Sequence, residues 1–273
     1  MLRTVTSHLQ MTTRRGASRL AFLVAVARQP GLDIDERLVC RLGDAELELI
    51  EFVGAHGAVT HVLDLGEDTE LGVPLTLDYE ARVSGSGDLG EMDEPAELLA
   101  YLRPSRYAES DRLFRLAHAE FGGLRGLELV RAVEAWVFDS LAYVRDSSRP
   151  TDGAVETMLA RQGVCRDYAH LVVALLRALD VPARVTSVYA PGLSPMDFHA
   201  VAEAWHENRW HAIDATRLAP RQSLLRISTG RDAADNAFLT SHGAGIRFQT
   251  LQVSAVVDGD LPVDDRTELV QIA

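Results

Sequence analysis

The chain has 273 residues, 47% of them hydrophobic, and a formal net charge of −13. This length allows two domains, and the composition is that of an ordinary globular protein. The negative charge argues against binding to nucleic acid or to an anionic membrane surface. No 18-residue apolar run that could cross a bilayer is found, and the first residues lack an apolar secretory core.

Residues 1–85 are predicted to form strands separated by Gly, Asp and Pro. The predicted strands are 20–27, 37–42, 47–53, 59–65 and 75–83. The segment 45–50 is equally compatible with a helix. Short strands between turn residues are typical of an antiparallel β-sandwich, which is the expected fold of this first domain.

A linker is predicted at 86–104, where Ser84-Gly85-Ser86-Gly87 is followed by the acidic stretch 91–95. Beyond it the apolar residues repeat with a helical period. The predicted helices are 111–121, 127–141, 154–161 and 165–179, and the predicted strands after them are 184–189, 198–206, 209–214 and 246–257. Helices followed by antiparallel strands predict an α+β domain over 105–273.

Three residues with complementary chemistry lie at the edges of these elements. Cys165 begins a helix, His199 opens a strand, and Asp214 ends the next strand. A helix N-terminus presents free N–H groups and a positive field, which favours the thiolate over the thiol. A thiol, an imidazole and a carboxylate can therefore act as nucleophile, base and orienting group.

The geometry of a hairpin tests this combination. If Glu207-Asn208 forms a two-residue turn, His206 pairs with Arg209, and His199 and Asp214 then share one face of the sheet within side-chain reach. Asn208 tolerates the positive φ of such a turn, whereas Glu207 suits it poorly. A three-residue loop would instead place His199 and Asp214 on opposite faces.

Several sequence motifs resemble the transglutaminase-like superfamily of Cys-His-Asp enzymes. They are Gly163-x-Cys165-x-Asp167-x-Ala169, Val181-Pro182-Ala183-Arg184, the segment 199–216 with His, Trp and Asp-Ala-Thr, Leu102-Arg103-Pro104-Ser105-Arg106-Tyr107, and Gly230-Arg231-Asp232-Ala233-Ala234-Asp235. The last two are similar to segments of bacterial transglutaminase-like cysteine proteases that have an N-terminal β-domain. The resemblance implies a papain-like or transglutaminase-like catalytic domain, with peptidase, amidase or transglutaminase activity.

The residues that would stabilise an oxyanion are only partly identified. The Cys165 backbone amide is one candidate donor, and the side chains of Gln162 and Tyr143 are candidates for the second. Asp167, in the first turn of the helix, is expected to interact with the helix dipole. His170 lies five residues beyond Cys165 and on another helix face, so it is expected to be a packed or solvent-facing histidine.

No metal or other cofactor is predicted. A zinc site of His199, His206 and His211 matches no usual ligand spacing, and solvated strand-end histidines are expected at 206 and 211. Trp205 and Trp210 could line a substrate groove or pack across strands. Cys40 is predicted to be a core residue. Two cysteines cannot form a disulfide framework, so a reducing cytoplasm is the expected compartment.

These observations lead to one function with two alternatives. The chain is expected to be a thiol enzyme that cleaves amide or peptide bonds through an acyl-enzyme thioester, with a peptide or protein amide as substrate. Transfer of the acyl group to an amine, as in a protein-glutamine transamidase, is the first alternative. A non-catalytic binding protein that retains the fold is the second. The sequence does not indicate an oligomeric state.

Overall fold

The computed structural model describes residues 1–14, 17–87, 95–243 and 246–273. The N-terminal strands are β1 (Arg3–Thr13), β2 (Ser18–Phe22), β3 (Leu32–Leu42), β4 (Ala45–Leu47), β5 (Ile50–Val53), β6 (Val59–Leu65) and β7 (Pro74–Gly85), with the 3-10 turn η1 (Ala55–Gly57) before β6. The middle of the chain contains α1 (Pro95–Ala100), α2 (Ser110–Phe121), α3 (Gly126–Ser140), β8 (Ala142–Tyr143), α4 (Ala154–Ala160), β9 (Gln162–Gly163) and α5 (Cys165–Ala178). The last elements are β10 (Ala183–Tyr189), β11 (Phe198–His206), β12 (Arg209–Ile213), η2 (Arg221–Ser223), β13 (Leu225–Gly230), β14 (Leu239–His242) and β15 (Ile246–Val257).

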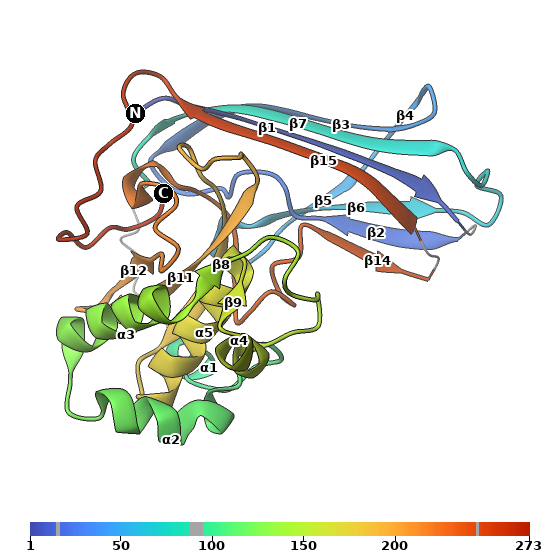
Figure 1. The fold of residues 1–273 in the computed structure, drawn as a ribbon. Helices are drawn as coiled ribbons and strands as arrows, with labels where there is room; N and C mark the ends of the chain where they lie inside the picture. The colour runs from blue at the N-terminus through green and yellow to red at the C-terminus, as the bar shows by residue number, and fades with distance from the viewer. Residues whose placement is uncertain (15–16, 88–94, 244–245) are drawn as a thin grey trace.

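Two of the sheets form a β-sandwich that lies beside an α+β unit (Figure 1). The sheets of the sandwich have the orders β15-β1-β7-β3-β4 and β14-β2-β6-β5. The α+β unit contains a sheet of order β12-β11-β10-β13, whose neighbouring strands all run antiparallel. The predicted fold class, an antiparallel sandwich followed by an α+β unit, is confirmed. Within the described residues, no helix is both long and apolar enough to span a bilayer.

The C-terminal strands do not lie where the sequence pattern placed them. The segment 246–257 was predicted as part of the α+β sheet, but it forms β15 and pairs with β1 along the sandwich. The fourth strand of the α+β sheet is instead β13, which follows the 3-10 turn η2. The sandwich is therefore built from both ends of the chain, because β14 and β15 return to it after the α+β unit is complete.

Two features of the N-terminal strands were predicted wrongly. The strand β1 was missed, because the buried Ser7 interrupts the apolar face formed by Val5, Leu9 and Met11. The apolar run 20–27 is a strand only as far as Phe22. Beyond it, the Ala27 backbone N–H donates to the carbonyl oxygen of Arg226 at 2.8 Å, so this part of the run packs against β13 rather than continuing the strand.

The prediction of one strand over 47–53 was wrong, because the chain passes there from β4, which ends at Leu47, to β5, which begins at Ile50 in the other sheet of the sandwich. The remaining predicted elements lie close to those observed. The segment 45–50, which was compatible with a helix, contains the short strand β4. Helix α1 lies inside the predicted linker, and most of the acidic stretch 91–95 lies outside the described residues. The four predicted helices agree with α2, α3, α4 and α5 to within about one or two residues, which is the usual spread between assignments.

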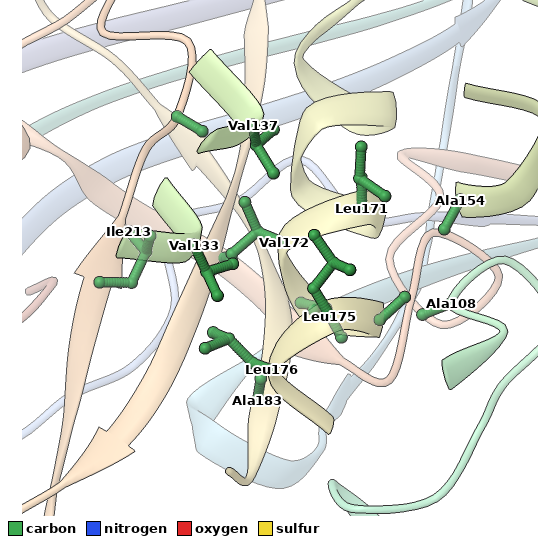
Figure 2. Close-up of a cluster of buried hydrophobic side chains, with 14 of the residues drawn as sticks. Ala108, Val133, Val137, Ala154, Leu171, Val172, Leu175, Leu176, Ala183 and Ile213 are labelled. Carbon is green, nitrogen blue, oxygen red and sulfur yellow. The ribbon is translucent and has the colours of Figure 1, made fainter. Parts of the chain in front are cut away.

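Helix α5 is the centre of the α+β unit. Its apolar positions repeat at helical spacing, and Leu171, Val172, Leu175 and Leu176 are fully buried. Figure 2 shows these side chains between Val133 and Val137 of α3, Ala154 of α4 and Ile213 of β12. Truncating one of these leucines to alanine would cost about 2–5 kcal/mol. This packing fixes the position of the first residue of the helix, Cys165.

The sandwich and the α+β unit share buried contacts. Tyr189 of β10 lies in the sandwich core and donates a hydrogen bond to the carbonyl oxygen of Val24 at 2.9 Å. Within η1, a Cβ on Gly57 would come within 1.9 Å of the Arg28 carbonyl oxygen, so glycine is required there. The neighbouring His56 reaches Tyr101 at 3.2 Å. These contacts hold the two units against each other.

Candidate active site

The thiol of Cys165 lies at the N-terminus of α5, on an end that is capped by a side chain. Val164 precedes the helix in an extended conformation, and its backbone N–H donates to the carboxylate of Asp167 at 2.8 Å. The other oxygen of that carboxylate pairs with Arg166 at 3.0 Å. Asp167 is fully buried, and its role is to cap the helix, which includes the favourable interaction with the dipole that was predicted.

Position 163, the first of the Gly-x-Cys-x-Asp motif, requires a glycine for a steric reason. A Cβ on Gly163 would lie 2.7 Å from the Cβ of Asp167 and 2.8 Å from its Oδ2. A side chain there would displace the carboxylate that caps α5. Gly163 and Asp167 therefore act together to start the helix at Cys165.

The hairpin between β11 and β12 has the predicted register. His206 pairs with Arg209, and Ala202 pairs with Ile213. Glu207 and Asn208 adopt φ of 50° and 61°, which defines a two-residue turn with two positive φ angles. The expected hairpin is confirmed, and Glu207 takes a positive φ in it although glutamate suits such a turn poorly. Since the side chains alternate along each strand, this register places His199 and Asp214 on one face.

The His199 imidazole and the Asp214 carboxylate are in contact. Nε2 of His199 lies 3.0 Å from Oδ2 of Asp214, and both residues are about 1% exposed. Burial lowers the pKa of His199, but the charge and hydrogen bond of Asp214, with a contribution from nearby Cys165, raise it to about 10. Burial raises the pKa of Asp214, and the interactions with His199 and Thr216 overcome this and lower it.

Thr216 fixes the orientation of Asp214. Oδ1 of Asp214 accepts hydrogen bonds from the Thr216 backbone N–H at 2.9 Å and from its hydroxyl at 2.7 Å. Oδ2 is thereby left facing His199. Thr216 belongs to the Asp-Ala-Thr motif, but no role was predicted for it from the sequence. The available signal was a threonine two residues after an aspartate at the end of a strand, because an Asp side chain often accepts a hydrogen bond from the residue two positions later.

The other nitrogen of His199 is available for chemistry. Nδ1 is buried and has no hydrogen-bond partner of ordinary geometry among the described residues, while the Cys165 side chain interacts with the ring. Cys165 and His199 both line one cavity of about 570 Å³. The structure thus brings the three predicted residues together in the order thiol, imidazole, carboxylate, and a free imidazole nitrogen remains on the side away from Asp214.

Of the two candidate oxyanion donors, one lies beside the thiol. Tyr143 lines a second cavity with Cys165, and its phenol oxygen faces the Cys165 backbone N–H. Burial raises the pKa of Tyr143 to about 12, with a contribution from Cys165, so the phenol keeps its proton at neutral pH. Gln162, on β9, is exposed, and it lines neither of the two cavities that include Cys165.

The other predicted histidines lie away from the thiol. His170 is fully buried, stacks on Tyr107 with ring centroids 5.4 Å apart, and accepts a hydrogen bond from the Ala233 backbone N–H at 3.1 Å. It is a packed histidine, as expected. His211 is 6% exposed and donates to the His206 carbonyl oxygen at 3.1 Å. The expectation of a solvated histidine at 211 was wrong, because its ring turns inward to this carbonyl.

Three further expectations concern metals, tryptophans and Cys40. Across the described ranges, no group of three His, Cys, Asp or Glu side chains is placed to hold a metal ion. Trp205 and Trp210 pair across β11 and β12 with ring centroids 5.2 Å apart, so they pack across strands. Cys40 is 1% exposed in the sandwich core, and burial raises its pKa to about 12, which confirms it as a core residue.

Comparisons with known proteins show which family the chain belongs to. The family model of the transglutaminase-like superfamily matches residues 118–215, which include all three residues. A crystal structure from Cytophaga hutchinsonii, named "Putative Cysteine Protease", superposes with a TM-score of 0.85 and 31% identity, and the match covers 98% of this chain and 96% of that one. The chain belongs to the transglutaminase-like superfamily.

Curated mycobacterial proteins match a shorter segment. An uncharacterized protein of Mycobacterium tuberculosis is 31% identical over 124 residues, and one of Mycobacterium leprae is 25% identical over 120 residues. The match spans 40% of the length of the first protein and 42% of the second. The family and the Cytophaga structure together support a thiol enzyme in the general sense.

Proposed function

We propose that this protein is a cysteine peptidase or amidase in which Cys165 is the nucleophile, His199 the base and Asp214 the orienting carboxylate. One observation carries the proposal. The thiol at the start of α5 and the imidazole of His199 line one cavity, while Asp214 holds the far side of that imidazole at 3.0 Å. This is the arrangement that activates a thiol for attack on an acyl group.

The first half of the reaction forms a thioester. The hydrogen bond to Asp214 assigns the Nε2 proton to that side, and the raised pKa of His199 favours a second proton on Nδ1, taken from the thiol, so the reacting state is a thiolate beside an imidazolium. The sulfur then bonds to the amide carbon, and the electrons of the C=O bond move to oxygen. When the intermediate collapses, the C–N bond breaks and the leaving nitrogen takes the proton from His199. The raised pKa of His199 favours the imidazolium that this sequence requires.

The second half returns the thiol. His199 takes a proton from water, the water oxygen attacks the thioester carbon, and the C–S bond breaks to release the acid and the reprotonated sulfur. In both halves the negative oxygen would lie between the Cys165 backbone N–H and the Tyr143 hydroxyl. The phenol oxygen faces the Cys165 backbone N–H, so both donors lie beside the thiol, and the phenol is protonated at neutral pH.

The test is an activity profile with matched cysteine variants. Wild-type protein, Cys165→Ala and Cys40→Ala are incubated with a peptide library and with glutamine-containing peptides, each with and without a primary amine. Mass spectrometry follows cleavage, loss of ammonia, amine incorporation and the acyl adduct on Cys165. We expect cleavage or deamidation by wild type and Cys40→Ala, and none by Cys165→Ala.

The same experiment separates the alternatives. Amine incorporation that exceeds hydrolysis would assign the protein to the transamidases. Product formed equally by Cys165→Ala would refute the proposed nucleophile. A folded wild-type protein that binds peptides but forms neither adduct nor product would be a binding protein that retains the fold, and would contradict the proposal.

A further inference from the structure

Two cavities of different chemistry meet at Cys165. One has a volume of about 700 Å³ and the other about 570 Å³. They share the residues Val164, Cys165, Asp197 and Phe198, so the thiol lies at their junction. A substrate whose carbonyl carbon reaches the sulfur can therefore extend into both cavities.

The larger cavity has a mixed lining, in which apolar residues such as Leu193 and Leu218 alternate with polar side chains. Besides Tyr143, these are Arg145, Asp146, Ser194 and Asp197. The smaller cavity is lined mainly by aliphatic and aromatic groups. They are Val185, Phe198, Ala200, Ala233, Ala234, Ala237, Phe238, Leu239 and Leu251. Its volume is within the range of about 300–1,000 Å³ that is typical of small-molecule sites.

The wall of the smaller cavity comes from both structural units. Leu239 belongs to β14 and Leu251 to β15, both strands of the sandwich (Figure 1). Their side chains are only partly buried, although both pack against the sandwich core. Apolar surface that remains accessible beside a reactive thiol is available to be buried by a ligand.

The opposite wall is held in place by buried polar groups. The carboxylate of Asp232 accepts hydrogen bonds from the backbone N–H groups of Tyr107 at 2.8 Å and Ala234 at 2.9 Å. His170 accepts one from Ala233 at 3.1 Å. The motif at 230–235 thus positions two alanines at the cavity, and their small side chains leave it open.

We propose that this apolar cavity is a side-chain subsite, so that the enzyme takes acyl substrates carrying a large aliphatic or aromatic group next to the reacting carbonyl. The inference rests on the proposed function of Cys165. It gives the sandwich a role in substrate selection through β14 and β15. Burying one large apolar side chain there is worth about 10- to 100-fold in reactivity.

The test uses alkylating agents that need no known substrate. Unsubstituted iodoacetamide is compared with N-(2-phenylethyl)- and N-(2-ammonioethyl)-iodoacetamide. In each case a C–S bond forms between Sγ and the methylene carbon, iodide leaves, and the thiol proton passes to His199 or solvent. The readout is the phenylethyl rate constant at Cys165 divided by the iodoacetamide rate constant of the same variant. Differences in thiol reactivity between variants therefore cancel.

We expect a ratio of about 10 or more in the wild type and a ratio near or below one for the ammonium reagent. Ala234→Leu fills the cavity from the α+β side, and Leu239→Asn makes its sandwich wall polar. Both should reduce the phenylethyl ratio at least about fivefold. Ala119→Leu makes the same exchange on an exposed position of α2, outside both cavities, and should keep the wild-type ratio. Circular dichroism checks the fold of each variant.

The outcomes separate this inference from the function on which it rests. Absence of labelling at Cys165 by iodoacetamide itself would refute the reactive thiol. Labelling by iodoacetamide without a preference for the phenylethyl reagent would refute the subsite and leave the thiol intact. A preference that persists in both folded cavity variants would place the apolar contact elsewhere, and would equally overturn the inference.

Discussion

His170 and His199 are both buried in the α+β unit, but their rings are driven to opposite protonation states. Burial lowers the pKa of His170 to about 4. At His199 the interactions with Asp214 outweigh burial and raise the pKa to about 10. At neutral pH the first ring is therefore neutral and the second is charged.

The difference lies in the carboxylate that each ring meets. Asp214 contacts His199 directly, and Thr216 turns one of its oxygens away so that the other faces the ring. The carboxylates near His170 are engaged elsewhere. Asp232 binds two backbone N–H groups, and Asp167 binds Val164 and Arg166. Burial alone makes a structural histidine, whereas burial with an oriented carboxylate makes a candidate base.

Removing the candidate base should have the largest effect on turnover, and it tests the comparison between His199 and His170 directly. His199→Ala should lower turnover of an amide substrate by at least about 1,000-fold while the fold survives. His170→Gln keeps an acceptor for the Ala233 N–H and should retain most activity. Steady-state kinetics on both variants, with circular dichroism as the check on folding, measures this. Equal losses in the two variants would mean that His199 has no special role.

Asp214→Asn should have a smaller effect, because the carboxylate orients and stabilises the imidazole without transferring the proton. We expect a loss about 10- to 100-fold smaller than that of His199→Ala. In addition, the pKa of His199 should fall below its usual 6.5, since burial is then less opposed. Titration of the ring by NMR gives this value. A His199 pKa that stays near 10 in the variant would show that Asp214 is not its cause.

His170 should make the free energy of unfolding depend on pH, and the direction of this dependence follows from the lowered pKa of the ring. Its pKa is lowered from 6.5 to about 4, so the unfolded chain binds a proton in this window that the folded ring does not. The contribution is present above pH 6.5 and is lost as the pH falls to about 4. On acidification, the free energy of unfolding of His170→Gln should therefore fall less than that of the wild type, by at most about 3 kcal/mol.

Denaturant unfolding between these pH values measures the slope. His118→Gln, on the exposed side of α2, is the matched control for exchanging a solvent-facing histidine. The same pH dependence in His170→Gln as in the wild type would contradict a neutral buried ring. His199 should give the opposite slope, with its contribution lost as the pH rises from 6.5 through about 10.

Chelation should have the smallest effect. The reaction proposed for Cys165 uses a thiol, an imidazole, a backbone N–H and a phenol hydroxyl, so EDTA should leave turnover within about twofold of its starting value. Activity is measured before and after dialysis against the chelator. Loss of activity that zinc or calcium restores would replace the thiol mechanism with one that needs a metal.

The positions of the three candidate residues were easier to predict from the sequence than the order of the sheets, because the two depend on interactions of different range. Cys165, His199 and Asp214 were found from local patterns, and the β11–β12 register follows from a two-residue turn at Glu207 and Asn208. Pairing between β1 and β15 joins segments more than 230 residues apart, and no local pattern encodes that contact. For the same reason Leu239 and Leu251 could not be assigned to a cavity beside Cys165.

Local composition also led to a wrong prediction where apolar residues are buried without belonging to a strand. The apolar run after Phe22 is buried between the sandwich core and the α+β sheet without being part of a strand, and apolar content alone does not distinguish the two. Tyr143 and Gln162 were equal candidates by sequence. Only the packing of β8 against β9 places the phenol over the Cys165 amide and leaves Gln162 exposed.

The most direct measurement is the rate at which iodoacetamide alkylates each cysteine of the native protein at about pH 6, followed by peptide mapping. Cys165, at a helix N-terminus beside His199, should react at least about 100-fold faster than Cys40, whose pKa burial raises to about 12. His199→Ala should remove most of this difference. Equal labelling of the two thiols, or no labelling of Cys165 in the folded protein, would contradict a catalytic thiol at this site.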